Sequence, residues 1–461
     1  MAEMDIKQLV DQVHDLLEAD DTHALTALLA EQRTSDIAEI VECLGAEYGY
    51  LIFHYLPHEE AAEVFGKINE ALRHQLYDLF DNKYLEKLIC ELDHDDAADI
   101  LSELPKEDTE KLLEGMEPEE SAMIKDLMRY SEDSAGGIMD PVLLSLTANQ
   151  TVAEAIKVIR EHEIDEDFFT VFITDDEGVY LGEVRIRSLI SSNPDTPLKN
   201  LVEEDVFFVR VDDDQEEIRN IFSKNELIVV PVLDEQNKLV GRITADRIIE
   251  VAEEEAAEDI YVMAGTDAIE RDLPSVFYAA RVRMTWLMPC MVGTGVTACV
   301  MLLFQKSFSG VYTVAASFAP MIGAISGNAG LQTSAVVVCG LATGHFAANS
   351  LRQVFLRETR VAAIVACCCG TIGGIIYSSL SHVLGHGLPT GVGLLKVSVA
   401  FGLSMFMAII VSTTLGLSLP FLFKKIGIDP AISSGPLVTT ANDSISVTIY
   451  MLMTLLFMSI N

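Results

Sequence analysis

The segment DPAISSGPLVTTANDSISVTIYMLMTLLFMSIN, residues 429–461, reads as a membrane-spanning helix that carries a carboxylate. Its apolar part can cross the roughly 30 Å of hydrocarbon in a bilayer, which takes about 20 helical residues. Asp443 lies about halfway between Lys425 and Asn461, deep in that apolar part. Because a charged side chain there costs roughly 2.5–3.5 kcal/mol on insertion scales, an acidic residue at this depth indicates an ion pathway.

Four further apolar stretches precede this one, at about 284–304, 311–343, 361–384 and 392–422, and the last runs over about 432–460. The second to fifth are rich in Gly, Ser, Thr and Ala, and such small residues allow helices to pack closely within a bilayer. We therefore expect a transmembrane domain of five helices over residues 283–461. Five helices form a thin wall for a pore, so we expect a homodimer in the lipid bilayer.

The distribution of Lys and Arg predicts how the spans are oriented. The first residues, MAEMDIKQLVDQVHDLLEADD, lack the basic and apolar regions of a signal peptide, which indicates a cytoplasmic N-terminus. The outer flanks then carry only Lys306 and Lys396, and the inner flanks carry Arg281, Arg283, Arg352, Arg357, Arg360, Lys424 and Lys425. By the positive-inside rule, we expect a multi-pass protein of the cell (inner) membrane with its C-terminus outside.

The part of the chain before the spans is strongly acidic. Residues after Tyr261 hold about 6 of the 71 acidic and about 10 of the 31 basic residues, so the first part carries about −44 and the last about +4 of the net −40. An acidic surface repels phosphates and attracts cations, which argues against nucleic acid as a partner. The eight cysteines form no C-x-x-C pair, so neither a disulfide framework nor a zinc site is predicted.

Residues 1–130 are expected to form an acidic, all-α superhelical N domain. Apolar residues recur there at helical spacing, as in LEKLICEL at 85–92. The segment YLPHEEAAEVF at 55–65 resembles ELPKEDTEKLL at 103–113. This repetition predicts helical hairpins stacked into a small solenoid.

Residues 131–200 and 201–258 read as two similar α/β modules. VFITDDEGVYLG at 171–182 aligns without gaps with VPVLDEQNKLVG, which starts about 59 residues further on, and each reads as strand, polar turn and strand. Amphipathic helices flank both segments. The duplication resembles a tandem pair of CBS modules, and a connecting helix is expected to follow at 259–282.

Amide side chains in the second span are candidate ion ligands. Asn328 and Gln332 are four residues apart, and so share one helix face, within the glycine-rich segment APMIGAISGNAGLQTSAV at 319–336. Amide oxygens suit hard cations or the waters around them. A hydrogen bond between helices is the alternative use of these amides.

Oxygen atoms also gather around the carboxylate of the last span. Thr439 and Asp443 are four residues apart on one face, and Thr440 and Asn442 supply oxygens nearby. The apolar parts of the spans contain no Lys or Arg to pair with Asp443. Its partner is therefore expected to be a cation or a symmetry mate. The alternative is a protonated carboxyl group bonded to a neighbouring helix.

Five segments closely resemble the signature sequences of the MgtE family of magnesium channels. They are GNAGLQ at 327–332, DPAISSGPLVTTANDS at 429–444, RVRMTWL at 281–287, LDHDDAADILSELP at 92–105 and EEEAAEDI at 253–260. The resemblance covers essentially the whole chain. It implies a homodimer with a pore along the dimer axis, in which Asp443 binds hydrated Mg²⁺ and Asn328 lines the pore.

The resemblance also implies regulation, with acidic residues that bind cytosolic Mg²⁺ and close the channel. The candidates are Glu59, Asp93, Asp95 and Asp96 in the N domain, Asp246, Glu250, Glu255, Glu258 and Asp259 near the end of the CBS pair, and Asp429 at the inner mouth. We expect Mg²⁺ to bridge these carboxylates and hold the connecting helix against the mouth. Mg²⁺ is thus expected both as the transported and as the regulatory ion.

Three positions depart from the family pattern. Arg247 follows Asp246 where two acids are usual, so a regulatory ligand is either lost or replaced by an internal ion pair. Cys339 stands where an Arg is usual, and Ser446 where a Gly is expected. These changes bear on regulation and helix packing more than on transport.

Two other functions remain open. The first is transport of another divalent ion such as Co²⁺ or Mn²⁺, although ligands with oxygen alone favour hard ions. The second is a membrane-bound sensor whose CBS pair binds a nucleotide. RIRS at 185–188 and TADR at 244–247 lack the Asp that usually holds the ribose in such modules, so we expect weak or absent nucleotide binding. No P-loop or nucleophile motif is present, so an enzyme is not expected.

Overall fold

The structure is a computed structural model that describes residues 6–141, 144–161, 170–203, 206–267, 276–344, 346, 351–383, 393–433 and 435–459. It divides into two compact units, Met1–Glu254 and Glu255–Asn461.

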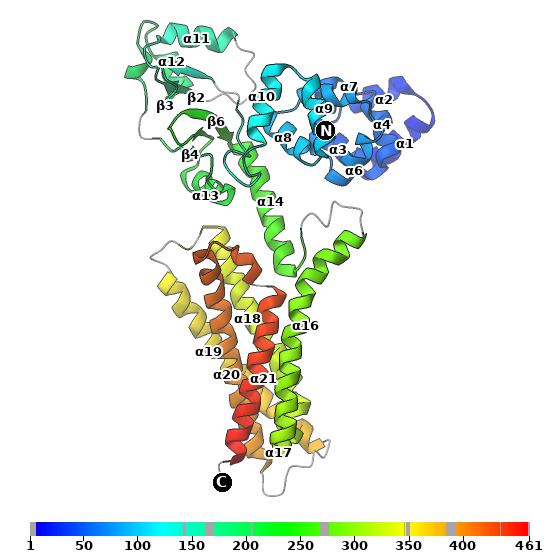
Figure 1. Ribbon diagram of the computed structural model, residues 1–461, viewed down its shortest axis with the longest axis vertical. Coiled ribbons are helices and arrows are strands. Elements are labelled where there is room, and N and C mark those ends of the chain that lie inside the picture. Colours follow the sequence, from blue (N-terminus) through cyan, green and yellow to red (C-terminus); the bar gives the residue numbers. More distant parts are fainter. Residues whose placement is uncertain are drawn as a thin grey trace. The chain divides into compact units, whose positions relative to one another are not determined.

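The first unit begins with an array of short helices, coloured blue to cyan in Figure 1. Asp21, Asn69 and Asp81 accept the N–H three residues further on and so cap α2, α6 and α7. Prolines precede or open α5, α9 and α10, where their missing N–H has no helical partner to lose. The helices are α1 (Ile6–Glu18), α2 (Thr22–Leu29), α3 (Thr34–Leu44), α4 (Ala46–Phe53), α5 (His58–Lys67), α6 (Glu70–Tyr77), α7 (Asn82–Cys90), α8 (His94–Ser102), α9 (Lys106–Gly115) and α10 (Pro118–Leu127).

Two three-stranded sheets follow, and they repeat one pattern. Their elements are β1 (Ser145–Thr147), α11 (Val152–Glu161), β2 (Thr170–Thr174), β3 (Tyr180–Arg185), α12 (Ile186–Ser191) and the 3₁₀ turn η1 (Leu198–Asn200), then β4 (Val209–Arg210), α13 (Gln215–Asn225), β5 (Val229–Leu233) and β6 (Leu239–Thr244). In each sheet the first strand is parallel and the third antiparallel to the middle strand. The irregularity at Ile173/Thr174 recurs at Val232/Leu233. The predicted duplication is therefore confirmed down to the register.

The described residues of this unit form two separate apolar clusters. One continuous cluster includes Phe53 and Phe65 in the helical array, Ile138 in the segment after it, and Val230 and Val251 in the second module. The first module has a separate core around the buried strand β2. The helical N domain, α1 to α10, is thus packed as one body with the second module.

Helix α14 (Ala245–Ala264) begins in the first unit and ends in the second. Residues 259–264 of the expected connecting helix continue α14, and its last residues begin the next helix. Residues 268–275 of that expected helix lie outside the described residues.

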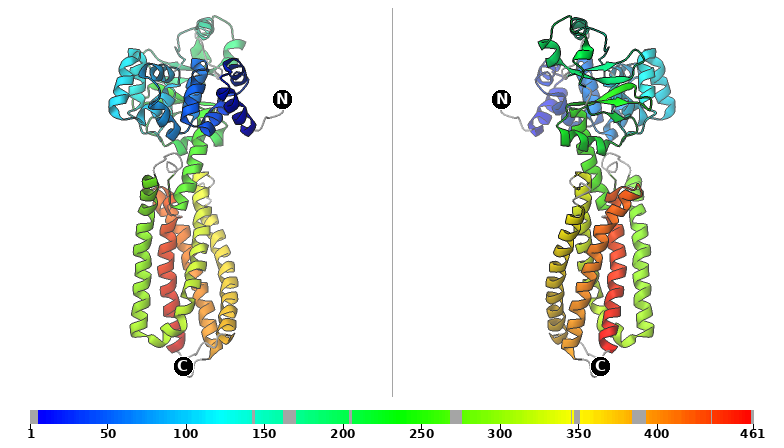
Figure 2. Two further views of the ribbon diagram at one scale, coloured as in Figure 1. Left: turned by 90° about the vertical axis from the view of Figure 1, so that its right-hand side faces the viewer. Right: turned by 90° about the vertical axis from the view of Figure 1, so that its left-hand side faces the viewer.

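Among the described residues of the second unit, five helical spans are long and apolar enough to cross a membrane, which confirms the predicted three-part fold. The helices run side by side in Figures 1 and 2. They are α16 (Val276–Ser307), α17 (Ser309–Ala315) with η2 (Ala316–Phe318) and α18 (Ala319–Ala342), α19 (Leu351–Val383), α20 (Leu394–Lys425), and η3 (Pro430–Ser433) with α21 (Pro436–Ser459).

Aromatic rings and glycines hold this bundle together. Phe318, Tyr377, Phe401 and Tyr450 form one buried cluster, in which the rings of Phe318 and Tyr377 lie 4.4 Å apart. At Gly416 an added Cβ would collide with the carbonyl oxygen of Gly330, so α18 and α20 approach backbone to backbone.

Candidate ion pathway and acidic regulatory clusters

Asp443 on α21 lies against a glycine-lined face of α18. A Cβ at Gly323 would stand 3.3 Å from Asp443 Oδ1, and one at Gly327 would stand 3.4 Å from the same atom. The two glycines therefore leave the space that the carboxylate occupies. Within the described ranges, Asp443 makes no hydrogen bond or ion pair and remains half-buried. The Asp443 carboxylate is thus uncompensated by any described group of the protomer.

Contacts with α16 fix the rotation of α21. The Ser444 hydroxyl donates to the Gly293 carbonyl at 3.0 Å and lies 2.8 Å from Thr297 Oγ1. Thr440, one turn before Ser444, packs against Gly293. These contacts turn the neighbouring Asp443 toward α18.

Thr439 shares the face of Asp443, as its spacing predicts. Its methyl carbon would lie 3.5 Å from a Cβ at Gly327, the same position that borders the carboxylate. Asn442 instead turns into the core of the protomer and is 1% exposed. It lies against Gly330, and both atoms of its amide lack a hydrogen-bond partner in the described part of the chain. In the single chain, Asn442 therefore does not join Thr439 and Asp443.

Ser446, which stands where a Gly is expected, makes a contact between helices. Its hydroxyl is buried and accepts a hydrogen bond of 2.7 Å from Ser326 Oγ on α18. A serine thus adds a polar bond at a helix crossing where only a glycine was expected. Cys339, the other departure within the spans, is exposed on α18.

Asn328 and Gln332 lie on a face of α18 that the protomer leaves exposed. Neither amide makes a hydrogen bond to the portion of the chain that is described. The hydrogen-bond alternative therefore finds no partner helix within the described protomer. Two exposed amides on a membrane helix require either a second copy or a water-filled path beside them.

The entrance to α21 is close to the end of α14. A Cβ at Gly265 would stand 2.7 Å from the ring of Pro436, and one at Gly435 would stand 3.1 Å from the Met263 carbonyl oxygen. Gly265 has φ +80°, a backbone conformation that glycine adopts without strain. Asp429 precedes η3 here, is exposed, and accepts the Ala431 N–H at 2.8 Å.

In the first unit, one guanidinium is surrounded by carboxylates from two helices. Arg247 on α14 lies 3.6 Å from an oxygen of Asp95, 3.6 Å from Asp96 and 3.0 Å from Asp99, all on α8. Glu250, one turn further along α14, is 3.1 Å away. This structure selects the ion-pair alternative for the departure at position 247. We call these five residues the Arg247 cluster.

Burial shifts the pKa values of the acidic residues in the Arg247 cluster. It raises the pKa of Asp95 to about 8, with Asp96 acting in the same direction and Arg247 opposing both. Burial also raises the pKa of Asp99 to about 7, again against Arg247. Burial lowers the pKa of Arg247, but the carboxylates of Asp95, Asp96 and Asp99 outweigh it, so the guanidinium stays charged.

Sequence reasoning named Asp95, Asp96 and Glu250 but missed Asp99. Asp99 is four residues after Asp95 and so faces the same way on α8, and this spacing was the signal that could have found it. Of the other predicted regulatory residues, Asp93 acts on Asp95 through its charge. Glu59, Asp93 and Asp246 are exposed in the first unit, while Glu255, Glu258 and Asp259 belong to the second.

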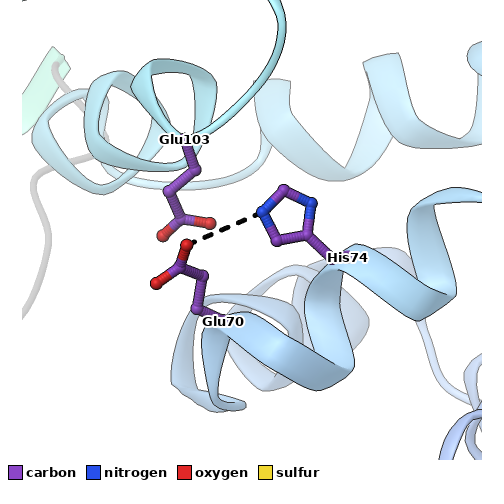
Figure 3. A group of neighbouring side chains, drawn as sticks. All are labelled: Glu70, His74 and Glu103. Atoms are coloured by element: carbon purple, nitrogen blue, oxygen red, sulfur yellow. Dashed lines mark ion pairs between the residues drawn. The ribbon is translucent and has the colours of Figure 1, made fainter. Parts of the chain in front are cut away.

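A second group of potential metal ligands was not predicted. Glu70 and His74 on α6 point toward Glu103 after α8, and one ligand atom of each lies within 4.8 Å of the others (Figure 3). Arg73 already contacts Glu103 at 3.1 Å and donates to the carbonyl of Ile68 at 2.7 Å. Because a fixed guanidinium supplies the positive charge here, we assign this group a structural role.

Known proteins match each part of the chain. The MgtE family, described as a divalent cation transporter, matches residues 319–453, the MgtE intracellular N domain matches 32–133, and the CBS domain matches 135–195 and 198–254.

Whole-length relatives match as well. The magnesium transporter MgtE of Thermus thermophilus is 30% identical over 96% of this chain and 97% of its own length. That of Bacillus subtilis is 26% identical over 97% of each chain. A solved structure of the cytosolic domain of the Mg²⁺ channel MgtE in complex with ATP is 30% identical, with a TM-score of 0.50, and covers 52% of this chain and 99% of that one. The chain is therefore a membrane protein that belongs to the MgtE family of magnesium transporters.

Proposed function

We propose that two copies of this chain form an Mg²⁺ channel whose pore passes the Asp443 carboxylates. The observation that carries the proposal is the placement of Asp443 against Gly323 and Gly327 without a cationic partner in the described residues. Mg²⁺ dehydrates reluctantly, so it is bound by one or two carboxylates together with several waters. Symmetry would bring two Asp443 side chains to one axis, and a ring of carboxylates favours cations over anions.

The exposed face of α18 supports the homodimer. Asn328 and Gln332 are exposed there, and a second copy would place two sets of amides around one path. Thr439 borders the same glycine as Asp443 and adds a hydroxyl. All these ligand atoms are oxygens, which favours Mg²⁺ over the softer Co²⁺. The distribution of Lys and Arg supports a cytoplasmic N-terminus and a C-terminus outside.

We also propose that cytosolic Mg²⁺ closes the channel through the acidic residues of the N domain and of α14. Repulsion between acidic surfaces is screened over about 8 Å at physiological salt, and divalent ions that bridge carboxylates replace it with attraction. The end of α14 packs at the entrance of α21, beside Gly435 and Pro436. Movement of α14 is therefore coupled to the entrance near Asp429.

We expect the CBS pair to bind nucleotide only weakly. Arg185, which could reach a phosphate, is 3.0 Å from Glu203 and so already has an anionic partner. Arg247 is similarly engaged in the Arg247 cluster. The ATP complex of the related cytosolic domain makes this a question for direct titration.

The decisive experiment is Mg²⁺ flux into proteoliposomes of the purified full-length protein. We expect saturable flux that Co²⁺ and Mn²⁺ inhibit only at higher concentration, and that falls when Mg²⁺ is added on the side of the N domain. Flux of Co²⁺ that exceeds that of Mg²⁺ under equal gradients would favour the other divalent ion. Complete absence of divalent flux would favour a sensor role.

A further inference from the structure

The Arg247 cluster joins two parts of the chain that are distant in sequence. Asp95, Asp96 and Asp99 come from α8, whereas Arg247 and Glu250 come from the first turns of α14. The Arg247 side chain is 14% exposed and that of Asp95 is 8% exposed. The cluster therefore lies inside the contact between the N domain and the second CBS module, which share one apolar core.

Three carboxylates within two turns of one helix repel one another. Asp95 is buried against α14, whereas 41% of the Asp96 side chain and 36% of the Asp99 side chain stay exposed, and a cation beside all three offsets their repulsion. A divalent ion could do this, but it would be bound only when its concentration in solution is high enough. A guanidinium does it permanently, because it is always charged and is covalently part of α14. Its planar fork also reaches several oxygens at once, as the 3.0 Å contact to Asp99 and the 3.1 Å contact to Glu250 illustrate.

We propose that Arg247 is a built-in cation that holds α8 against α14 in the absence of Mg²⁺. The inference rests on the proposed regulation and deepens it by assigning which acidic residues Mg²⁺ does not need to bridge. A divalent ion at Asp95 or Asp99 would stand beside the guanidinium and be repelled by it. Regulatory Mg²⁺ therefore binds acidic residues outside the Arg247 cluster. The N domain stays docked on the second CBS module when Mg²⁺ is removed.

Hydrogen exchange of the full-length protein in lipid nanodiscs tests this contact. In the wild type, we expect the amides of α8 and of the first turns of α14 to remain protected in EDTA. Arg247→Met should increase their exchange at least tenfold in EDTA, and millimolar Mg²⁺ should restore protection by taking the vacated place. The matched control is Arg129→Met, which removes an exposed guanidinium paired with Asp126 at 2.7 Å and should exchange like the wild type in both conditions.

Two further variants keep the proposal testable if Arg247→Met is poorly folded. Arg247→Lys retains the charge without the fork and should be partly protected in EDTA. Arg247→Met combined with Asp95→Asn removes both the cation and the most buried carboxylate, and should regain protection relative to Arg247→Met alone.

Either of two results would overturn the proposal. One is a wild type that loses protection in EDTA as fully as Arg247→Met. The other is an Arg247→Met protein that stays protected without Mg²⁺. Exchange is measured independently of flux, so a protein that conducts no Mg²⁺ but shows the expected exchange would sink the channel proposal and leave the role of Arg247 standing.

Discussion

At the scale of the residue, helix geometry decides what each polar side chain of α21 touches. Successive residues of a helix are turned by about 100°, so Asp443 and Asn442 cannot serve the same surface. Asp443 follows Thr439 by one turn and borders Gly327 with it, whereas Asn442 enters the core. Spacing of four in the sequence was enough to predict the first pair. Nothing in the sequence told which side of α21 faces the protomer, because contacts with α16 determine it.

Replacing Asp443 by alanine should reduce Mg²⁺ flux to the level of empty liposomes, at least a hundredfold, because the only described carboxylate within the spans that borders the glycine face is lost. Flux into proteoliposomes measures this, with size-exclusion elution as the check on folding. Thr448→Val is the control, since its hydroxyl bonds only within α21, to the Ser444 carbonyl at 2.7 Å. Wild-type flux in a well-folded Asp443→Ala protein would remove Asp443 from the pathway.

Asn328→Ala should have a milder effect, a few-fold loss of flux or of selectivity for Mg²⁺ over Ca²⁺. An amide carries no full charge, so it orders the waters of the ion but does not compensate its charge. Flux measured with Ca²⁺ as the competitor separates the two effects. A loss as complete as that of Asp443→Ala would mean that Asn328 supports folding of α18 or dimer assembly.

The Arg247 cluster predicts how stability changes with pH. The pKa of Asp95 is raised to about 8 and that of Asp99 to about 7, so the folded protein binds more protons than the unfolded chain between about pH 4 and those values. Stability of the first unit should therefore fall as pH rises through this window, by up to about 1.4 kcal/mol per pH unit for the buried Asp95 and by less for Asp99, which solvent screens. The fall should level off above about pH 8.

Urea unfolding followed by exchange of α8 amides between pH 5 and 8.5 measures this slope. Groups that face Asp95 are Asp93 and Asp96 on its own segment, Arg247 on α14, and Asp140. Asp99 faces Arg247, Asp96 and Glu132. Asp95→Asn should remove much of the pH dependence, and an unchanged slope in that variant would assign it to other groups.

At the scale of the element, periodicity predicted most of what the structure contains. The five spans, the short amphipathic helices and the two strand–turn–strand units all follow from local patterns in the sequence. The partners of Arg247 do not, because α8 and α14 are separated by about 150 residues and only the folded core brings them together. The sequence could raise an internal ion pair as one alternative, but it could not name Asp99 as the closest of the three acids on α8.

The residues at the strand ends of the CBS pair predict weak binding of nucleotide. Neither module has the Asp that usually holds the ribose, and Arg185 is paired with Glu203. Isothermal titration with ATP should therefore give a Kd weaker than about 100 μM, which corresponds to roughly −5.5 kcal/mol. A tighter Kd would require a different set of ribose ligands. Glu203→Gln, which frees Arg185, should tighten binding if phosphate contacts limit it.

At the scale of the whole molecule, the shared core limits how the N domain can be studied. Removing residues 1–130 would expose the apolar surface that the second CBS module contributes to that core. A truncated protein that stays open would thus mix loss of a sensor with loss of packing. Substitution of charges on the intact chain avoids this problem.

Replacing Asp93, Asp95 and Asp96 together by asparagine should leave the channel open at millimolar Mg²⁺, with several-fold more flux than the wild type. The exposed Asp93 carboxylate, which a bridging ion would join, is then absent, and so are two of the carboxylates that pair with Arg247. The matched control replaces Glu107, Asp108 and Glu110, three exposed acids of α9, and should keep the wild-type midpoint. An unchanged midpoint in the first triple variant would place the sensor on α14 or in the pore.

Mg²⁺ should also protect the wild type from limited proteolysis outside the α8–α14 contact, whereas Na⁺ at equal ionic strength should not. Bridging needs a divalent ion, and screening alone reduces repulsion without creating attraction. The rate of loss of the full-length band measures this. Equal protection by Na⁺ would mean that the acidic surface responds to screening only.

The division of the cores also determines which pieces of this architecture can be exchanged during evolution. Recombination that swaps the entire CBS pair between two homologues would cut through the core that the N domain shares with the second module. A swap of residues 144–203 alone would leave both cores whole, because this part of the first module has its own apolar interior around β2, whereas Ile138 before it belongs to the shared core. The inheritable building block is therefore the N domain with the second module, and this part of the first module is the replaceable insert. Chimaeric proteins, and biosensors built from them, should be cut at the borders of that insert.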